Sequence, residues 1–451
     1  MTTTTTESTL ELTAIDDRND ASGTTNDDNI EQGSQLNTQS LPPVDGGWQA
    51  WTFLSACFAL EAIVWGLPFS FGIFQTHYQA NPLFSTSTSS LAAIGTTTIG
   101  VSYFSSPFVG IFLQTFPRTR RPCMLVGLTI MCTALIGASY SSTISLLILT
   151  QGALYGLGTI LLYYPSNLFL DEWFISRKGL AYGIMFAGTG FAGVIVPFIL
   201  EWLLNTYSFR TTLRIWTIVT FILTLPCMNF IRPRLPPSNS SALRPRDLLF
   251  VRHKLFWLFQ FGNTIQSLGV FIPSLWMPTF ALSIDLPSYS GPLSLAFYNG
   301  AYSIGNICGG HLTDKFHVST VILISTLGAM LGTFVFWGLA QGQAMLYIFA
   351  IVWGSCSGIF NIAWTGCARV VGRKTSPNGV IDTGIYIGIM AAGKGIGGVV
   401  SGPLSEKLLE LGWRTSADFV YGSMFAPLVI FCGITAAFGG SACVGRLLKM
   451  F

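Results

Sequence analysis

The stretch RPRLPPSNSSALRPRDLLFVRHK, residues 232–254, is the longest polar interruption of the chain after its N-terminal tail. On either side of it, six apolar stretches of membrane-spanning length follow one another, separated by short polar turns. A helix needs roughly 20 apolar residues to cross a bilayer, and only helices or closed barrels satisfy every backbone group there. The sequence therefore predicts an all-α membrane protein with twelve transmembrane helices in two six-helix bundles.

The predicted parts follow from this pattern. Residues 1–44 are rich in Thr, Ser, Asn and Asp and cannot bury enough apolar surface to fold, so we expect a disordered cytosolic tail. We expect an N-terminal bundle at 45–231, a basic cytosolic linker at 232–253, a C-terminal bundle at 254–447 and a short cytosolic tail at 448–451. The expected spans are 50–76, 88–113, 122–140, 144–170, 179–204, 212–231, 254–282, 292–313, 318–339, 343–368, 380–404 and 418–445.

Composition supports a membrane protein and excludes several other classes. Charged residues make up 10% of the 451, against about 25% in soluble domains, and the mean hydropathy is +0.56. The net charge of +3 gives no indication of a nucleic-acid partner. The nine cysteines form no CxxC or Cys/His cluster, so we expect neither a metal site nor a disulfide framework. No cofactor is predicted, and no Walker A loop is present in the sequence.

The distribution of basic residues predicts the orientation. One set of alternate loops, with the C-terminus, holds Arg118, Arg120, Arg121, Arg177, Lys178, the basic residues of 232–254, Lys315, Arg369, Arg373, Lys374, Arg446 and Lys449. The other set holds only Arg210, Arg214, Lys407 and Arg414. Because Lys and Arg are enriched in cytosolic loops, both termini are expected in the cytosol.

Three stretches carry a family resemblance. They are PVDGGWQAW at 43–51, DEWFISRKGLAYG at 171–183 followed by AGTG at 187–190, and GHLTDK at 310–315. Together they resemble the major facilitator superfamily, and within it the monocarboxylate-transporter-like branch common in fungi. The resemblance covers roughly residue 43 to the end. It implies a secondary carrier whose cargo sits near the bilayer midplane, with helices 1, 4, 7 and 10 lining the cavity.

The same stretches supply candidates for a conformational latch, which are Arg177, Lys178, Asp314 and Lys315. Arg177 and Lys178 lie where a cytosolic loop enters a helix; on a simpler interpretation they are topology anchors only. The resemblance implies that Asp314 and Lys315 clasp a neighbouring helix end when the carrier faces outward. The matching place in the first half has Gln114 instead of an acid, so this copy is expected to be weaker. Glycines at 179, 183, 188, 190 and 193 are expected to let the fifth and eighth helices approach closely.

Two charges near mid-membrane are candidates for function by default, because a charge there is costly. Glu61 shares a helix face with Trp65 and Phe69, and is expected either to carry a proton or contact a cation, or to be satisfied by a neighbouring helix. Lys394, between Gly393 and Gly395, is expected either to oppose an anionic cargo or to extend to the interface. A direct pair between Glu61 and Lys394 is a further alternative.

Polar and aromatic side chains at helical spacing complete the candidate set. They are Tyr163, Asn167, Asn263, Gln266, Tyr298, Tyr302, Asn306, Asn361 and Trp364. Each alone is as compatible with an interhelical hydrogen bond as with a ligand contact, but the set predicts a wide, aromatic, weakly polar cavity. The animal lactate carriers of the family use a lysine in helix 1 and an aspartate–arginine pair in helix 8. Here the first place reads LPFS at 67–70 and the pair is replaced by Tyr302 and Asn306.

These features favour a secondary active transporter for a small organic compound, with export of a secondary metabolite preferred. Proton-coupled uptake of a monocarboxylate or vitamin-like nutrient is the alternative, followed by a non-transporting nutrient sensor; an enzyme is not predicted. The expected partners are the organic substrate, protons in the coupled case, and the lipid bilayer. The plasma membrane is preferred over the vacuolar membrane. The sequence fixes no oligomeric state, and a monomer is compatible with it.

Overall fold

The computed structural model describes residues 42–84, 88–235, 248–375, 381–411, 419–441 and 446. The chain divides into two units, Met1–Pro42 and Pro43–Phe451, and the helices from α2 onward belong to the second. Most of the predicted tail, the centre of the basic linker and the predicted C-terminal tail lie outside the described residues.

The described part of the chain is helical and holds no strand. The first half comprises α2 (Gly47–Phe69), α3 (Phe71–Ala80), α4 (Thr88–Thr115), α5 (Arg120–Ser139), α6 (Ile144–Leu147), a π-helical turn (Ile148–Leu154), α7 (Tyr155–Trp173), α8 (Lys178–Thr206) and α9 (Phe209–Phe230). The second comprises α10 (Lys254–Val270), α11 (Ile272–Ser283), α12 (Ser290–Lys315), α13 (Val318–Leu331), a π-helical turn (Gly332–Trp337), α14 (Gln343–Thr375), α15 (Thr383–Glu410) and α16 (Ala426–Gly439).

Nine helical segments within the described ranges are long and apolar enough to cross a membrane. They are Gly47–Ala80, Pro117–Ser139, Ile144–Trp173, Lys178–Thr206, Phe209–Phe230, Lys254–Ser283, Val318–Trp337, Gln343–Thr375 and Thr383–Glu410. The helices α4 and α12 have 28 and 26 residues but are not among these nine. The apolar helix α16 is shorter, with 14 residues.

Local sequence explains where the helices break and begin. Pro68 lies in the last turn of α2, and Pro273 in the first turn of α11, so the corresponding amide hydrogen bonds are missing. Each of these spans therefore consists of two helices in succession. Asp382 begins α15 because its carboxylate accepts a hydrogen bond from the amide of Ile385 at 2.9 Å, as an N-cap does.

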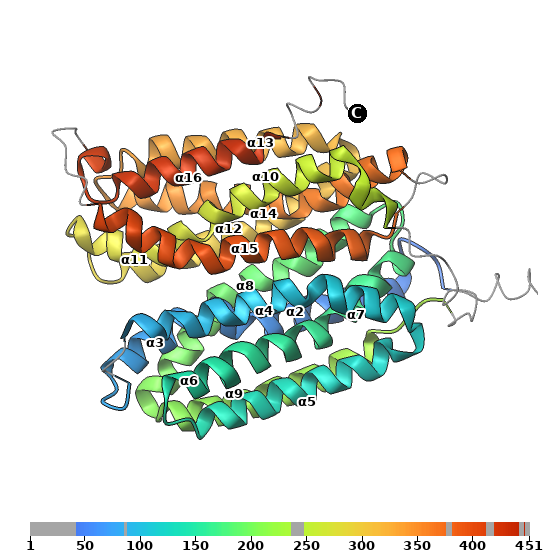
Figure 1. The fold of residues 1–451 in the computed structure, drawn as a ribbon, viewed down its shortest axis with the longest axis horizontal. Coiled ribbons are helices and arrows are strands. Elements are labelled where there is room, and N and C mark those ends of the chain that lie inside the picture. Colours follow the sequence, from blue (N-terminus) through green and yellow to red (C-terminus); the bar gives the residue numbers. More distant parts are fainter. Residues whose placement is uncertain are drawn as a thin grey trace, which may run out of the picture. The chain divides into compact units, whose positions relative to one another are not determined.

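The two halves meet along two pairs of helices. In Figure 1 the helices of the first half, blue to green, lie together on one side, and those of the second half, yellow to red, lie together on the other. Across this boundary α8 packs along α12 and α4 packs along α15. Small residues allow the close approach: a Cβ added at Gly179 would lie 2.6 Å from the carbonyl oxygen of Gly310.

One of the predicted glycine contacts goes elsewhere. Gly179, Gly183, Gly190 and Gly193 all face α12. Gly188 instead faces α2, where an added Cβ would lie 3.1 Å from the Cβ of Glu61. The glycines of α8 therefore serve two neighbours, and the prediction of a single partner helix is wrong for Gly188.

Candidate functional site

A cavity of about 450 Å³ of empty space, part of it open to solvent, lies where the two halves meet. Its walls come from α2 and α8 on one side and from α10, α12, α14 and α15 on the other. The lining residues are Phe69, Thr189, Gln266, Val270, Phe271, Tyr298, Asn299, Tyr302, Ser357, Phe360, Asn361 and Lys394. Most of the surface is therefore supplied by the second half.

Lys394 is the one lining residue with a full charge. Its side chain is 8% exposed, and its Nζ donates to Oδ1 of Asn361 at 2.8 Å. Three aromatic rings surround the ammonium, with centroids 5.9 Å away for Tyr103, 5.8 Å for Phe271 and 5.5 Å for Trp364. Such rings attract a cation through their electron-rich faces.

Glu61 lies one layer behind the cavity wall. It is 3% exposed, and its Oε1 accepts a hydrogen bond from the hydroxyl of Thr189 at 3.0 Å. Oε2 is buried and has no hydrogen-bond partner in the structure. No ion pair within 4 Å joins Glu61 to Lys394 among the described residues. The direct pair considered from the sequence is therefore not formed in this conformation.

Trp65, which follows Glu61 on α2, is the centre of an aromatic cluster. The indole of Trp65 stacks on Tyr103, with centroids 5.1 Å apart, and meets Phe69 and Tyr163 edge-on. Its Nε1 is buried without a hydrogen-bond partner. Trp65 thus connects the α2 face predicted from the sequence to Tyr103, which also faces Lys394.

The structure brings five of the sequence-derived candidates to the cavity surface, which are Gln266, Tyr298, Tyr302, Asn361 and Lys394. Trp364 and Asn263 hydrogen-bond to each other at 3.0 Å, and Asn263 also donates to the carbonyl of Met390 at 2.8 Å. Both border a smaller cavity of about 250 Å³ inside the second half. Asn306 donates to the carbonyl of Tyr302 at 3.0 Å and lies off the central cavity.

The fourth span does not line the central cavity, contrary to what the resemblance implies. Tyr163 packs on Trp65, and Asn167 is fully buried within the first half, where its carbonyl oxygen accepts from Tyr182 at 2.9 Å. The helix α7 packs against α5 and α4, and both side-chain amide atoms of Asn167 are buried without a hydrogen-bond partner in the structure. Helical spacing identified the polar face of this span but not the neighbour that it meets.

Several lining residues were not predicted from the sequence. Thr189 lies in the quoted AGTG segment, whose glycine spacing indicates helix packing and not a ligand contact. Asn299 donates to the carbonyl of Gly193 at 3.1 Å, which joins α12 to α8. Phe271 and Phe360 supply aromatic surface, and nothing in their local sequence distinguishes them from other apolar residues.

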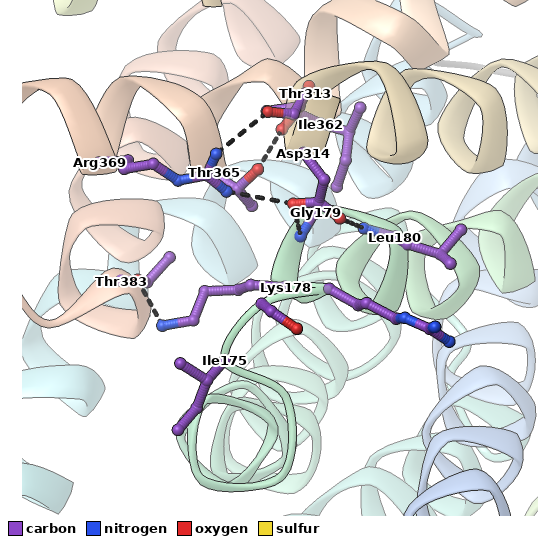
Figure 2. Close-up of polar contacts among 12 residues, drawn as sticks. Ile175, Lys178, Gly179, Leu180, Thr313, Asp314, Ile362, Thr365, Arg369 and Thr383 are labelled. Carbon is purple, nitrogen blue, oxygen red and sulfur yellow. Dashed lines mark hydrogen bonds and ion pairs between the residues drawn. The ribbon is translucent and has the colours of Figure 1, made fainter. Parts of the chain in front are cut away.

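At the end of the bundle where α8 begins, called the charged end here, Asp314 joins the two halves. Its carboxylate accepts hydrogen bonds from the amides of Gly179 and Leu180, both at 2.8 Å, and pairs with Arg369 at 3.1 Å (Figure 2). The N-terminus of a helix carries partial positive charge, so a carboxylate there is stabilising. Lys315 is exposed and makes no comparable contact.

Lys178 forms a second contact across the halves at the charged end. Its Nζ lies 3.0 Å from Oδ1 of Asp171. It also donates to the hydroxyl of Thr383 at 3.2 Å (Figure 2). Asp382, which precedes Thr383, is solvent-exposed as a residue. Desolvation of its carboxylate, and then repulsion from Asp171, raises the pKa of Asp382 to about 6.

The segment PVDGGWQAW at 43–51 anchors the start of α2 to the charged end. The Asp45 carboxylate accepts hydrogen bonds from the amides of Ile175, Ser176 and Arg177, at 3.0, 2.9 and 3.0 Å. Burial raises the pKa of Asp45, but these hydrogen bonds outweigh it and hold the pKa below its ordinary value. Arg177 contributes its amide, while its side chain is exposed. Trp48, next in the segment, is 82% exposed, as an interfacial indole would be in the absence of lipid.

A bundle of apolar helices with a largely aromatic cavity and one buried lysine between its halves defines a multi-pass integral membrane protein of the solute-carrier type. The comparisons with known proteins agree. A family model described as Major Facilitator Superfamily matches residues 53–392. The chain therefore belongs to the major facilitator superfamily, and its function is transport of small molecules across a bilayer.

Three curated relatives indicate which branch of the superfamily the chain is similar to. The chain is 30% identical over 274 residues to the MFS-type transporter pytF of Aspergillus terreus, covering 60% of this chain and 92% of that one. It is 25% identical over 416 residues to the Fujikurins efflux protein of Gibberella fujikuroi, covering 91% and 86%. It is 25% identical over 387 residues to Monocarboxylate transporter 13 of Rattus norvegicus, covering 85% and 87%. These relatives confirm the predicted fungal, monocarboxylate-transporter-like branch.

A solved structure supports the fold. The crystal structure of the nucleoside transporter NupG superposes with a TM-score of 0.62 at 14% identity, covering 90% of this chain and 100% of that one. The likeness concerns the fold alone, and it agrees with the all-helical architecture predicted from the sequence.

Proposed function

We propose that this protein exports a small organic compound, of the secondary-metabolite kind, by alternating access at the central cavity. The observation that carries the proposal is the position of that cavity: both halves form its walls, and at the charged end Asp314 and Lys178 join the halves through polar contacts that rocking can break. In carriers of this architecture the two halves move against each other around a fixed site. The contacts at the charged end are polar and few, so they can be exchanged for water.

The proposal includes twelve spans with both termini in the cytosol. Beyond the nine apolar segments, α4, α12 and α16 complete the set. Two buried hydroxyls of α4 are satisfied within the protein: those of Thr98 and Ser102 each share their proton between a carbonyl of their own helix and the carbonyl of Gln151 or Gly156. A helix whose hydroxyls are paired in this way is compatible with a bilayer. The basic residues gathered at the charged end support a cytosolic position for it, and we place the protein in the plasma membrane.

The lining supports a bulky or aromatic cargo. Five of the cavity residues are aromatic, which are Phe69, Phe271, Tyr298, Tyr302 and Phe360. The helix 8 positions that are charged in lactate carriers hold Tyr302 and Asn306 here, so the anion site of those carriers is missing. The named efflux function of one fungal relative supports export.

Proton-coupled uptake of a monocarboxylate is the second candidate. It is favoured by one observation, the buried Glu61 with a free oxygen on one side of the cavity and the buried Lys394 on the other. A carboxylate that can take up a proton and an ammonium that can bind an anion are the two elements that such coupling needs. The likeness to a relative named as a monocarboxylate transporter is consistent with it.

Transport by the purified protein in liposomes tests the proposal. We expect saturable flux of aromatic or amphipathic organic compounds, and little flux of lactate or pyruvate. Liposomes with the Glu410→Gln variant serve as the matched control, since Glu410 is exposed at the far end of α15 and pairs only with the exposed Lys407. Proton-coupled uptake of lactate or pyruvate, with larger aromatic compounds ignored, would favour the second candidate instead.

Direction is tested in the organism. A deletion strain should retain in its cell extract a compound that the parent strain releases into the medium. Loss of a compound from the cell extract, with its accumulation in the medium, would show uptake.

A further inference from the structure

We infer that Lys394 forms an anion-binding subsite, and that the cargo is an aromatic compound with one negative charge on a carboxylate or acidic phenol group. The inference deepens the proposed function and rests on it, because it names the chemical class that the central cavity takes. It depends on the contacts of the Lys394 ammonium, and on the lack of a carboxylate paired with it among the described residues.

The ammonium of Lys394 is buried with only part of its hydrogen-bonding capacity used. It has three N–H donors, and one is taken by Oδ1 of Asn361. Asn361 is neutral, and no carboxylate lies within 4 Å of Nζ among the ion pairs of the described residues. Buried charges are normally paired, and inside a membrane an unpaired one is costly. An anion in the adjoining cavity would supply the missing partner.

Three aromatic rings enclose the ammonium of Lys394, and neighbouring glycines allow the helices to pack closely around it. A Cβ added at Gly395 would lie 2.7 Å from the Cβ of Tyr103, so only glycine lets α4 bring that ring so close. On the other side of Lys394, Gly393 packs against Gln260 and Thr264 of α10. The two glycines thus let α4 and α10 close around the lysine. The rings attract the ammonium without neutralising it, which leaves its charge available to a ligand.

Aromatic surface continues from the lysine into the cavity. Phe271 faces both Lys394 and the cavity, and Tyr298 and Tyr302 stack on each other with centroids 6.4 Å apart. A flat ring with an anionic group at its edge would place the charge at Lys394 and the ring between these faces. Gln266 lines the same cavity, and its side-chain amide offers a further donor to the oxygens.

Glu61, behind the opposite wall of the central cavity, limits the ligand to a single negative charge. Glu61 reaches the cavity only through Thr189, whose hydroxyl is donated to it. A second negative charge on the ligand would approach this carboxylate with no further lysine or arginine in the lining to offset it. Monoanions are therefore expected to bind better than dianions.

Matched acid and amide pairs test the inference with the purified full-length protein. The probes are benzoate and benzamide, trans-cinnamate and cinnamamide, and 1-naphthoate and 1-naphthamide, with phthalate as the dianion and lactate as the small aliphatic anion. Binding is measured by calorimetry in detergent. We expect at least one aromatic acid to bind tenfold or more tightly than its own amide, and more tightly than phthalate or lactate.

A variant set assigns the preference to the lysine. Lys394→Met keeps the length of the side chain without its charge, and should reduce the acid-over-amide preference to about one. Lys407→Met, on the exposed end of the same helix, is the control and should keep the full preference. Size-exclusion profiles identify a variant that does not fold, and in that case the comparison on the wild-type protein decides alone.

Two results would overturn the inference. One is a wild-type protein that binds no acid of the panel more tightly than its amide. The other is a folded Lys394→Met variant that keeps the wild-type preference. Neither result touches the proposed function, which fails separately if the protein in liposomes moves no organic solute, neutral or charged.

Discussion

Replacing Asp314 by asparagine should shift the balance between the two conformations that alternating access requires. Asp314 is the one acid in the described residues that caps α8 from the opposite half, through the amides of Gly179 and Leu180. Asparagine has the same shape and keeps one accepting oxygen, but it loses the second acceptor and the charge that interacts with the helix N-terminus. The variant should therefore fold and pack normally, while the contact between the halves at the charged end weakens.

The size of the effect is set by the electrostatic interactions that asparagine cannot make. A carboxylate at a helix N-terminus contributes about 0.3–1 kcal/mol through the helix dipole, and up to about 2 kcal/mol where it is partly buried. The Asp314 side chain is 10% exposed, which places it toward the upper end of that range. The ion pair between Asp314 and Arg369 adds little, because that arginine is 37% exposed. In the variant, Arg369 also keeps its hydrogen bond to the Thr313 carbonyl, which is 3.2 Å long. A loss of about 1–2 kcal/mol changes the ratio of conformers about 5- to 30-fold.

Distances between the halves measure this ratio directly. Spin labels at Arg121 and Lys374, both exposed at the charged end on opposite halves, report its opening by pulsed electron spin resonance in a background without native cysteines. We expect a longer-distance population that grows in Asp314→Asn relative to the wild type. Glu410→Gln is the control and should match the wild type. A distance distribution identical in the folded Asp314→Asn variant and the wild type would refute the assignment of Asp314 as a contact that biases the conformers.

Three further predictions concern proton coupling, acidity and packing. Glu61→Gln should remove the pH dependence of transport between pH 5.5 and 7.5 without loss of fold, since glutamine can still accept the Thr189 hydroxyl; an unchanged pH profile in liposomes would exclude Glu61 from coupling. Because the pKa of Asp382 is raised to about 6 in the closed charged end, closure should be most stable below about pH 4 and weaken as pH rises through 6. The label distances should show that opening, and Asp382→Asn, which keeps the N-cap, should abolish it; the same pH response in that variant would contradict the prediction. Gly190→Val should stop transport while leaving each half folded, because a Cβ there meets the backbone of Asn299 in α12; wild-type flux would show that α8 and α12 need not approach so closely.

The all-helical architecture and part of the cavity were accessible from the sequence because they depend on periodicity and composition. Lys394 stands out as a charge in an apolar helix, and Tyr298 and Tyr302 follow from their four-residue spacing on one helix face. Such patterns identify residues that share a face, and the structure indeed brings Gln266 and Asn361 to the same cavity.

The pattern could not reveal which neighbour each face meets. Asn263 and Trp364 were both identified as polar lining, yet they satisfy each other inside the second half. Asn167 of α7 is buried and does not line the cavity, while Tyr164 of the same helix donates to the carbonyl of Gly384 in the second half at 2.9 Å. Thr189 was missed because its role depends on Glu61, a residue far away in the sequence.

The most direct test of the account is to lock the charged end and measure flux. Cysteines at Lys178 and Thr383, whose side chains meet across the halves at 3.2 Å, can be joined by a short reversible bifunctional thiol reagent in a background without native cysteines. If the halves must separate there for each transport cycle, the protein in liposomes should lose its flux of aromatic organic compounds on cross-linking and regain it on reduction. Undiminished flux through the fully cross-linked protein would contradict alternating access at this cavity.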